Sequence, residues 1–355
     1  MPLVAANLLA GLTGLDDLDG LGRVGGRFFA YFLLTTSLAI GLGVAVTALL
    51  SPGAGIALPA APGSLEAGKA PGLGDFLFNL VPDNVFAALA EGRVIQLIVF
   101  VLLLGVAAMF APTDIRLAFH RGASVADVVL RELVNLIMRF APVGIGALSA
   151  GAAAQFGSEM FGPLSLLVVG IWVAQLIFAV SILLLLALIL RQSPLPFLRA
   201  TGPIYATAAA TCSSMASLAV ALRIAQERLK LPRHIYSLTI PLGSQLSKEG
   251  TATMLAAVLI FTAQASGVSF NWPDYGTILL VTLLLSGASG GIPGGGLVKV
   301  LIIVQAFNLP LEIAAVVGGV YRVIDIGNTT VNMLGDMVGT QIVAAMEEDG
   351  GDARL

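Results

Sequence analysis

Five polar residues near the carboxyl end of the chain share one face of a predicted helix. Arg322, Asp325, Thr329, Asn332 and Asp336 follow one another at spacings of 3, 4, 3 and 4 residues, which places them in one row along an α-helix. Asp325 and Asp336 lie about 16 Å apart along such a helix, so the row can serve two sites at different depths. Carboxylate, amide and hydroxyl oxygens bind hard cations such as sodium, and a carboxylate also binds an ammonium group. An Arg322–Asp325 ion pair is the structural alternative, but it leaves Asp336 and Asn332 unexplained.

Two adjacent charges, Lys248 and Glu249, interrupt a long apolar segment. Between residues 235 and 273 the sequence contains no other Asp, Glu, Lys or Arg. A charge inside a membrane costs about 2.5–3.5 kcal/mol on insertion scales, so by default it indicates a functional site with a partner. Neighbouring residues point about 100° apart on a helix, so we expect separate roles for the two side chains.

The composition indicates an integral membrane protein. Of 355 residues, 57% are hydrophobic and 11% are charged, less than half of the roughly 25% charged residues of soluble domains. The single cysteine excludes a disulfide framework, and no Cys/His cluster has zinc spacing. The glycine-rich GGIPGGG lacks the lysine of a phosphate loop, and no nucleophile has an evident histidine partner. We therefore expect no enzyme, no organic cofactor and no nucleic-acid partner.

Long apolar runs predict the helices that position these residues. The runs at 28–65, 94–113 and 160–190 are each long enough for the roughly 20 residues that cross a bilayer, while 51–85 is a Pro/Gly-rich, external loop. By the positive-inside rule, the connections rich in basic residues face the cytoplasm, as does the acidic tail at 347–355. The basic residues in question are Arg23, Arg27, Arg116, Arg121, Arg131, Arg191, Arg199, Arg223, Arg228, Lys230 and Arg233.

Two apolar segments are broken by small residues. The segment 277–307 has two apolar halves of about 15 Å each, separated by a Gly/Ser-rich stretch from Ser286 to Gly296. A similar break occurs in ATAAATCSSMASLAVAL at 206–222. Irregular backbone at membrane depth must be buried in protein or line a wet cavity, and paired interrupted segments indicate a transporter site. The alternative is two glycine kinks that let helices pack closely, and the presence of two breaks favours re-entrant hairpins.

Three blocks of sequence resemble the dicarboxylate/amino acid:cation symporter family. They are TCSSMASLAVALRIAQE (211–227), PLGSQLSKEGTA (241–252), and the stretch from SGASGGIPGGG to YRVIDIGNTTVNMLGD (286–336). The similarity covers essentially the whole chain and is strongest from 235 to 345. Motif order, spacing and the two broken segments all agree.

The resemblance implies an all-α, multi-span transporter with two re-entrant hairpins and an inverted-repeat, elevator-type fold. It implies a homotrimer in the cell inner (plasma) membrane that takes up an amino acid or dicarboxylate together with Na+ or H+. The first helix and most of the second are expected to be missing. The expected parts are a remnant of the second scaffold helix (1–20), the third helix (21–50), an external loop with scaffold helices (51–158), a transport domain (160–346) and the tail. Within the transport domain the resemblance places the sixth helix, a hairpin at about 202–230, the seventh helix at 235–266, a hairpin at 277–308 and the eighth helix at 313–346.

The resemblance also assigns site residues. It matches Asp325 to the carboxylate that binds the substrate amino group. The substrate-binding set is Ser213, Ser214, Thr251, Gly291, Pro293, Asp325, Asn328, Thr329 and Asn332. The sodium-binding set is Thr35, Thr36, Gly243, Ser247, Glu249, Ser286, Ser289, Asn332 and Asp336.

Several departures from the family pattern bear on coupling. The family motif Asn-Met-Asp-Gly-Thr reads Ser247-Lys248-Glu249-Gly-Thr here, so the charged pair lies where the family unwinds a helix to coordinate sodium. Glu249 still offers carboxylate oxygens, and a protonated Lys248 can replace a bound sodium as a tethered charge. Phe32 stands where a family tyrosine contributes to a third cation site. We therefore expect fewer coupled sodium ions, with a proton as the alternative coupling ion.

Another departure bears on the substrate. Asn328 occupies the position of the arginine that clamps the side-chain carboxylate in members that take acidic substrates, and an amide cannot supply a bidentate guanidinium fork. This favours a neutral or polar amino acid. The altered cation motif also leaves open a non-transporting family member that acts as a binding protein.

Overall fold

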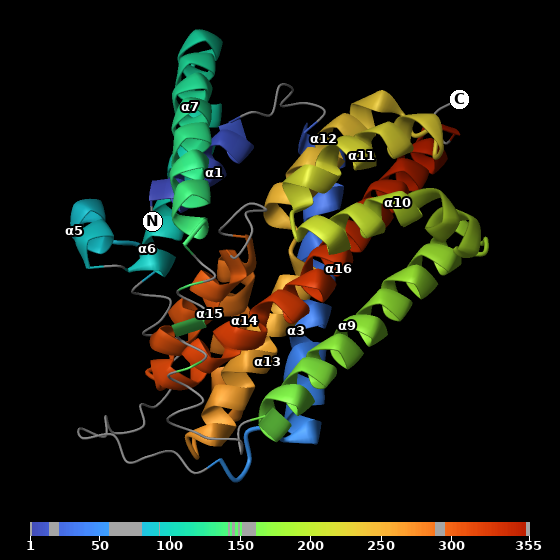
Figure 1. The fold of residues 1–355 in the computed structure, drawn as a ribbon. Coiled ribbons are helices and arrows are strands. Elements are labelled where there is room, and N and C mark those ends of the chain that lie inside the picture. Colours follow the sequence, from blue (N-terminus) through green and yellow to red (C-terminus); the bar gives the residue numbers. More distant parts are fainter. Residues whose placement is uncertain are drawn as a thin grey trace.

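The protein is helical throughout the part of the chain that the structure, a computed structural model, describes (Figure 1). The described residues are 2–13, 21–56, 80–91, 93–140, 143, 146–147, 150, 161–287 and 295–352. The helices are α1 (Pro2–Thr13), the π-helical turn η1 (Leu21–Gly25), α3 (Gly26–Leu50), α5 (Val85–Ala90), α6 (Val94–Met109), α7 (Thr113–Met138), α9 (Phe161–Leu190), α10 (Leu195–Thr211), α11 (Ser214–Glu227), α12 (Arg233–Leu246), α13 (Glu249–Ala265), α14 (Trp272–Gly287), α15 (Gly295–Ala306) and α16 (Leu311–Asp352).

The helices form two groups (Figure 1). In the smaller group α1 packs against α6 and α7, and α5 packs against α6. The larger body combines α3 and α9 to α16, with α13 and α16 in contact with most of its other helices.

Helix α13 forms the centre of the larger body. Every one of its residues except Gln264 is buried, as expected for a helix that is apolar on all sides. Helix α3 runs alongside it, and Gly43 permits the close approach because a Cβ there would collide with the Thr253 backbone. At the end of the same contact, the Gln264 side chain bonds the backbone of both Thr47 and Gly53. These contacts fix the axial position of α13, and therefore the position of Glu249 at its first residue.

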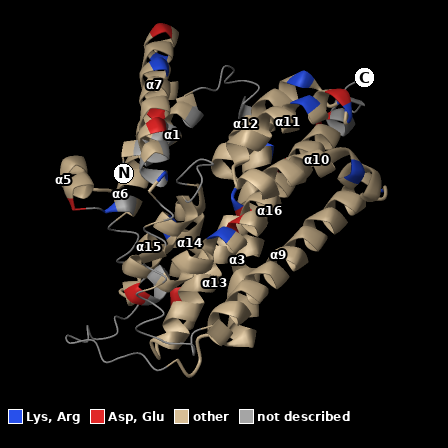
Figure 2. Ribbon diagram, viewed as in Figure 1, with Lys and Arg blue, Asp and Glu red and all other residues tan. Residues whose placement is uncertain are grey.

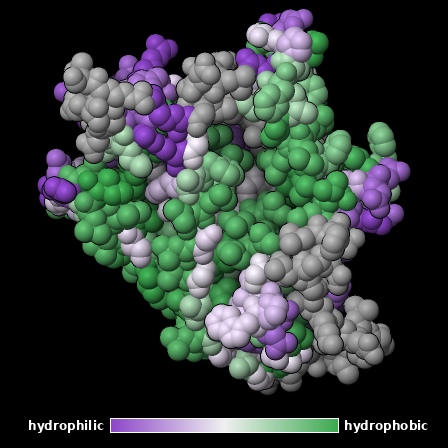
Figure 3. Space-filling view, turned by 180° about the vertical axis from the view of Figure 1, so that it is seen from behind, coloured by the Kyte–Doolittle hydropathy of each residue, from purple (hydrophilic) through white to green (hydrophobic). Residues whose placement is uncertain are grey.

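Within the described residues, two helices are long and apolar enough to cross a bilayer by length and composition, Arg23–Leu50 and Phe161–Leu190. The second, α9, buries a stripe that includes Phe178 and Ile182 but exposes Trp172, Leu176 and Leu188. Exposed apolar side chains on this scale are typical of a lipid-facing surface. Figure 3 shows one such face, with hydrophobic residues over its centre and hydrophilic residues mainly toward its edges.

The described residues contain one helix break inside the predicted first hairpin and one inside the predicted seventh helix. Helices α10 and α11 pack against each other around a tip at Cys212 and Ser213, where Cys212 has a left-handed conformation (φ 50°). Helices α14 and α15 also pack against each other, and residues 288–294 between them lie outside the described part of the chain. The predicted helix 235–266 is two helices, because the extended residues Ser247 and Lys248 separate α12 from α13.

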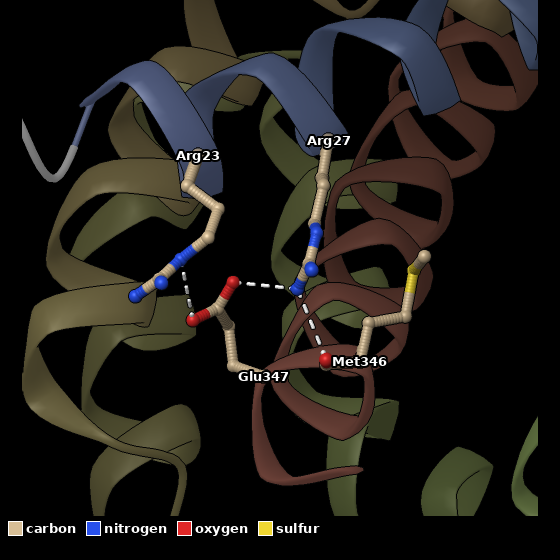
Figure 4. A network of polar contacts seen from close by, with 4 residues as sticks. All are labelled: Arg23, Arg27, Met346 and Glu347. Carbon is tan, nitrogen blue, oxygen red and sulfur yellow. Dashed lines mark hydrogen bonds and ion pairs between the residues drawn. The ribbon is translucent and has the colours of Figure 1, made fainter. Parts of the chain in front are cut away.

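The last helix is longer than predicted. We expected it to end at 346, followed by an acidic tail, but α16 continues to Asp352. Glu347 in this extension binds two arginines of the predicted cytoplasmic side, Arg23 at 3.2 Å and Arg27 at 2.6 Å (Figure 4). Arg27 also donates to the Met346 carbonyl at 3.0 Å. The acidic residue is thereby held against η1 and α3 instead of belonging to an unstructured tail.

Charged residues gather at this same end of the larger body, and a small group lies at mid-height (Figure 2). Among the described residues, the buried charged side chains are Lys248, Glu249, Lys299, Asp325 and Asp336. Burying charges is costly unless they are paired or ligated. The mid-height group is therefore the candidate site.

Candidate substrate and cation site

The break between α12 and α13 is held by an amide from another helix. The first N–H groups of α13 have no partner within the helix, and Lys248 at the cap position has no side-chain acceptor. Asn332 of α16 supplies one, because its Oδ1 accepts from the Gly250 N–H at 2.9 Å and the Thr251 N–H at 3.4 Å. Its Nδ2 donates to the Thr251 hydroxyl at 3.3 Å. Asn332 therefore fixes the start of α13 relative to the polar row of α16.

Two fully buried carboxylates lie beside this break. Glu249 Oε1 accepts from the Ser247 hydroxyl at 2.7 Å and the Thr35 hydroxyl at 3.0 Å. Glu249 Oε2 and both Asp336 oxygens accept no hydrogen bond from the described residues. The two carboxylates lie close enough to repel each other, and Lys248 attracts both. Buried polar atoms are normally satisfied, so three unsatisfied carboxylate oxygens fit a cation site.

Glycines provide the space for both carboxylates. A Cβ added to Gly243 of α12 would lie 2.5 Å from Asp336 Oδ1, and one added to Gly335 of α16 would lie 2.7 Å from Glu249 Oε2. Each carboxylate therefore packs directly against the backbone of a neighbouring helix. The glycines determine where the carboxylate oxygens lie.

We expect Gly335→Ala to weaken cation binding, because the added methyl group must displace the Glu249 carboxylate. Sodium is expected to raise the melting temperature of the wild-type protein by mass action, and this increase should shrink in the variant. Gly318→Ala in the same helix is the matched control, since its Cβ would meet only Leu297 at an ordinary 3.5 Å. An equal sodium-induced increase in both variants would contradict the expectation.

A cavity adjoins the cation site. Its empty volume is about 340 Å³, part of which is open to the outside. The lining comes from the tip of the first helix pair, the α12–α13 break, the start of α15 and the polar row of α16. The lining residues are Cys212, Ser214, Lys248, Thr251, Gly295, Gly296, Lys299, Tyr321, Asp325, Thr329 and Asn332.

Asp325 is oriented in this cavity by a tyrosine. The Tyr321 hydroxyl donates to Asp325 Oδ1 at 2.9 Å and accepts from the Gly296 N–H at 3.1 Å. The interaction ties α16 to the first turn of α15, and a side chain at Gly296 would collide with the Tyr321 hydroxyl. Arg322 is exposed and lies beyond ion-pair distance of Asp325, so the alternative ion pair is not formed. The carboxylate remains available to a ligand with a positive group.

Two lysines line the same cavity. Lys248 donates to the Ser214 hydroxyl at 3.2 Å and to the Ser244 carbonyl. Lys299 of α15 donates to the Ser286 carbonyl of α14 at 2.7 Å. The sequence analysis identified Lys248 but missed Lys299. The same signal was present, since Lys299 is the lone charge in the apolar stretch GLVKVLIIVQAF.

Asn328 does not line the cavity. Its Oδ1 accepts from Gln175 Nε2 of α9 at 2.8 Å, and its Nδ2 contacts the Met254 sulfur at 3.2 Å. Gln175 also donates to the Gly250 carbonyl at 3.2 Å and is 97% shielded from solvent. Through Gln175, the Asn328 side chain links α9 to the α12–α13 break.

The structure brings most of the predicted residues together. Ser214, Lys248, Thr251, Asp325, Thr329 and Asn332 line the cavity, and Thr35, Gly243, Ser247, Glu249 and Asp336 surround the carboxylate pair. Thr36 is fully buried, with a hydroxyl that has no partner among the described residues. Ser213 caps α11, and the Ser286 hydroxyl donates to Leu283 within its own helix. Gly291, Pro293 and Ser289 lie outside the described residues.

A helical protein with long apolar helices and a polar cavity beside two buried carboxylates has features expected of a solute transporter. The chain belongs to the sodium:dicarboxylate symporter family, whose model matches residues 1–346. The resemblance that the sequence motifs indicated is therefore confirmed, and the members of this family are transporters instead of enzymes.

Curated relatives match almost the whole chain. The proton/glutamate-aspartate symporter of Escherichia coli K12 is 28% identical over 359 residues, which cover 98% of this chain and 82% of that protein. The proton/sodium-glutamate symport protein of Bacillus caldotenax is 28% identical, with 98% and 84% covered. The C4-dicarboxylate transport protein of Bacillus subtilis is 28% identical, with 99% and 85% covered.

Proposed function

We propose that this protein is a cation-coupled symporter that takes up an amino acid or a dicarboxylate as a multi-pass protein of the inner (plasma) membrane. The observation that supports this most strongly is the adjacency of the two binding regions. Lys248 and Asn332 line the cavity, and Lys248 also attracts the carboxylate pair. A cation between Glu249 and Asp336 would therefore alter the groups that contact the substrate, which is the physical basis of coupled binding.

The arrangement of the helices supports an elevator-type movement. The cavity is lined by the tip between α10 and α11, the break before α13, α15 and α16, while α1, α6 and α7 form their own group. In this proposal the larger body is the transport domain, and the smaller group is part of the scaffold of a homotrimer. In the same proposal the α10–α11 and α14–α15 pairs are the re-entrant hairpins. The α14–α15 pair is the outer gate, because Gly296 in the first turn of α15 contacts Tyr321 in the cavity.

Substrate class depends on which charges face the ligand. The sequence favoured a neutral or polar amino acid because Asn328 replaces an arginine. Since the Asn328 side chain bonds to Gln175, substrate preference is better judged from the cavity itself. The cavity contains two lysines and one carboxylate among the described residues, and the named relatives include glutamate, aspartate and C4-dicarboxylate transporters.

Labelled uptake into proteoliposomes tests the transport function. L-aspartate, succinate and L-serine would be supplied separately under an imposed sodium gradient, an imposed proton gradient, or neither. The proposal predicts that one of the two gradients drives accumulation of at least one substrate. A preparation shown to be folded that binds a substrate but accumulates none under either gradient would instead indicate a non-transporting binding protein.

Lys248→Met tests the tethered-charge hypothesis. If the Lys248 ammonium replaces a bound sodium near Asp336, removing it should restore a requirement for that ion. We expect the apparent sodium dependence of uptake or binding to become steeper, with a higher Hill coefficient. Ser244→Ala is a suitable control, because Lys248 contacts the Ser244 backbone carbonyl, which this change retains. An unchanged sodium dependence in Lys248→Met would count against the hypothesis.

A further inference from the structure

Lys299 is a buried cation without an ionic partner among the described residues. Its side chain is 4% exposed, and no described carboxylate lies within ion-pair distance. An ammonium group has three donors, and the single hydrogen bond found for it is to the Ser286 carbonyl. Leaving a buried charge unpaired is strongly unfavourable, so the position requires an explanation.

A purely structural role explains one of the three donors. Ser286 lies in the last turn of α14, where carbonyl groups lack helical partners and a lysine interacts favourably with the helix dipole. A neutral donor of similar length would satisfy the same carbonyl without the cost of burying a charge. The structural role therefore leaves the full charge, and its place in the cavity lining, unexplained.

The charges around the cavity favour an anionic ligand. Lys248 and Lys299 both line it, against the single carboxylate of Asp325. The Lys248 ammonium donates hydrogen bonds to the Ser214 hydroxyl and the Ser244 carbonyl, and it attracts the Glu249 and Asp336 carboxylates. Asp325 accepts from Tyr321 and lies near enough to Lys299 to attract it, although not in an ion pair. Lys299 is thus the cation that is left for a ligand in the cavity.

We propose that Lys299 binds a carboxylate of the substrate and that it makes the cavity selective for acidic substrates. This inference rests on the proposed transport function and assigns its substrate class, a compound with two carboxylates such as an acidic amino acid or a C4-dicarboxylate. With an acidic amino acid, Asp325 contacts the amino group while Lys299 binds one carboxylate. Lys299 therefore supplies the positive charge for a substrate carboxylate that Asn328, which bonds to Gln175 of α9, does not supply.

The test measures binding, without requiring transport. Ligand-induced increases in melting temperature would be measured for L-aspartate, succinate and L-serine at fixed sodium, with wild type, Lys299→Met and Lys299→Arg. Losing one partner of a buried charge pair weakens binding by on the order of 100-fold. We therefore expect Lys299→Met to weaken the binding of aspartate and succinate by about that factor and to change serine binding by no more than a few-fold. Lys299→Arg should retain the preference for acidic ligands.

Two results would overturn the proposal. The first is a wild-type protein stabilised by serine but by neither aspartate nor succinate. The second is that Lys299→Met weakens the binding of all three ligands equally and makes that binding depend more steeply on sodium concentration. This result would show that the lysine substitutes for a bound cation. Failure of the transport function gives a different pattern, namely acidic ligands that bind through Lys299 but are never accumulated. Folding of each variant is checked by its ligand-free melting temperature, which we expect to be unchanged or higher in Lys299→Met because an unpaired charge is removed.

Discussion

Asp336→Asn is expected to abolish gradient-driven uptake. Asp336 is fully buried and neither of its oxygens accepts a hydrogen bond from the described residues, so its negative charge is available to a cation. Losing that charge should weaken cation binding by on the order of 100-fold, the effect of removing one partner of a buried charge pair. The measurement is substrate accumulation in proteoliposomes against the concentration of the driving cation.

Glu312→Gln in the first turn of the same helix is the matched control, because this acidic side chain is exposed. The control should accumulate substrate as the wild type does. Asp336→Asn should also lose the cation-induced increase in melting temperature, which separates lost cation binding from a later defect in transport. Normal accumulation by Asp336→Asn at low cation concentration would rule out the proposed cation site.

Asp325→Asn should have a comparably large effect, limited to substrates with an amino group. The carboxylate lines the cavity and is oriented by Tyr321, so it can bind an ammonium group directly. We expect the KM for L-aspartate to rise on the order of 100-fold. Succinate has no amino group, so its uptake should be kept or improved, because a repelling negative charge is removed.

Tyr321→Phe separates orientation from charge. It removes the hydroxyl that bonds both Asp325 and the Gly296 N–H but leaves the carboxylate in place. A smaller loss, about tenfold, is expected because the charge of Asp325 is kept; this is the low end of the roughly 1.5–3 kcal/mol of a hydrogen bond to a charged group. If Asp325→Asn impaired the uptake of aspartate and of succinate equally, the carboxylate would be a structural element of the cavity instead of a contact for the substrate amino group.

Local sequence patterns predicted the parts of the site that lie on one helix. The spacing of Asp325, Thr329, Asn332 and Asp336 was enough to place them in one row, and the isolated Lys248–Glu249 pair indicated a site at what proved to be a helix break. Such patterns work because helical periodicity fixes which side chains share a face. They also gave the approximate position of the break between α10 and α11, which small residues make evident.

Contacts between distant helices were not predictable in this way. Asn332 caps α13 and Gln175 bonds Gly250 and Asn328 across sequence separations of 75 to 153 residues, and neither contact leaves a local pattern. The expectation of a neutral substrate required the Asn328 side chain to point where the family arginine points, because the two residues occupy the same position in the sequence. In the structure the Asn328 side-chain oxygen accepts from Gln175 of α9, a contact that a single sequence does not reveal.

The five buried charged side chains of the described residues would also set how the membrane potential acts on the proposed elevator-type movement. Two lysines and three carboxylates give a net charge of −1 when all are ionised and no ligand is bound. Each elementary charge that crosses the membrane changes the energy by about 2.3 kcal/mol per 100 mV. In an elevator-type movement, an inside-negative potential would therefore drive the empty site outward. With neutral residues at positions 248 and 299 the same site would have a charge of −3, so the lysines reduce the voltage dependence of this step about threefold.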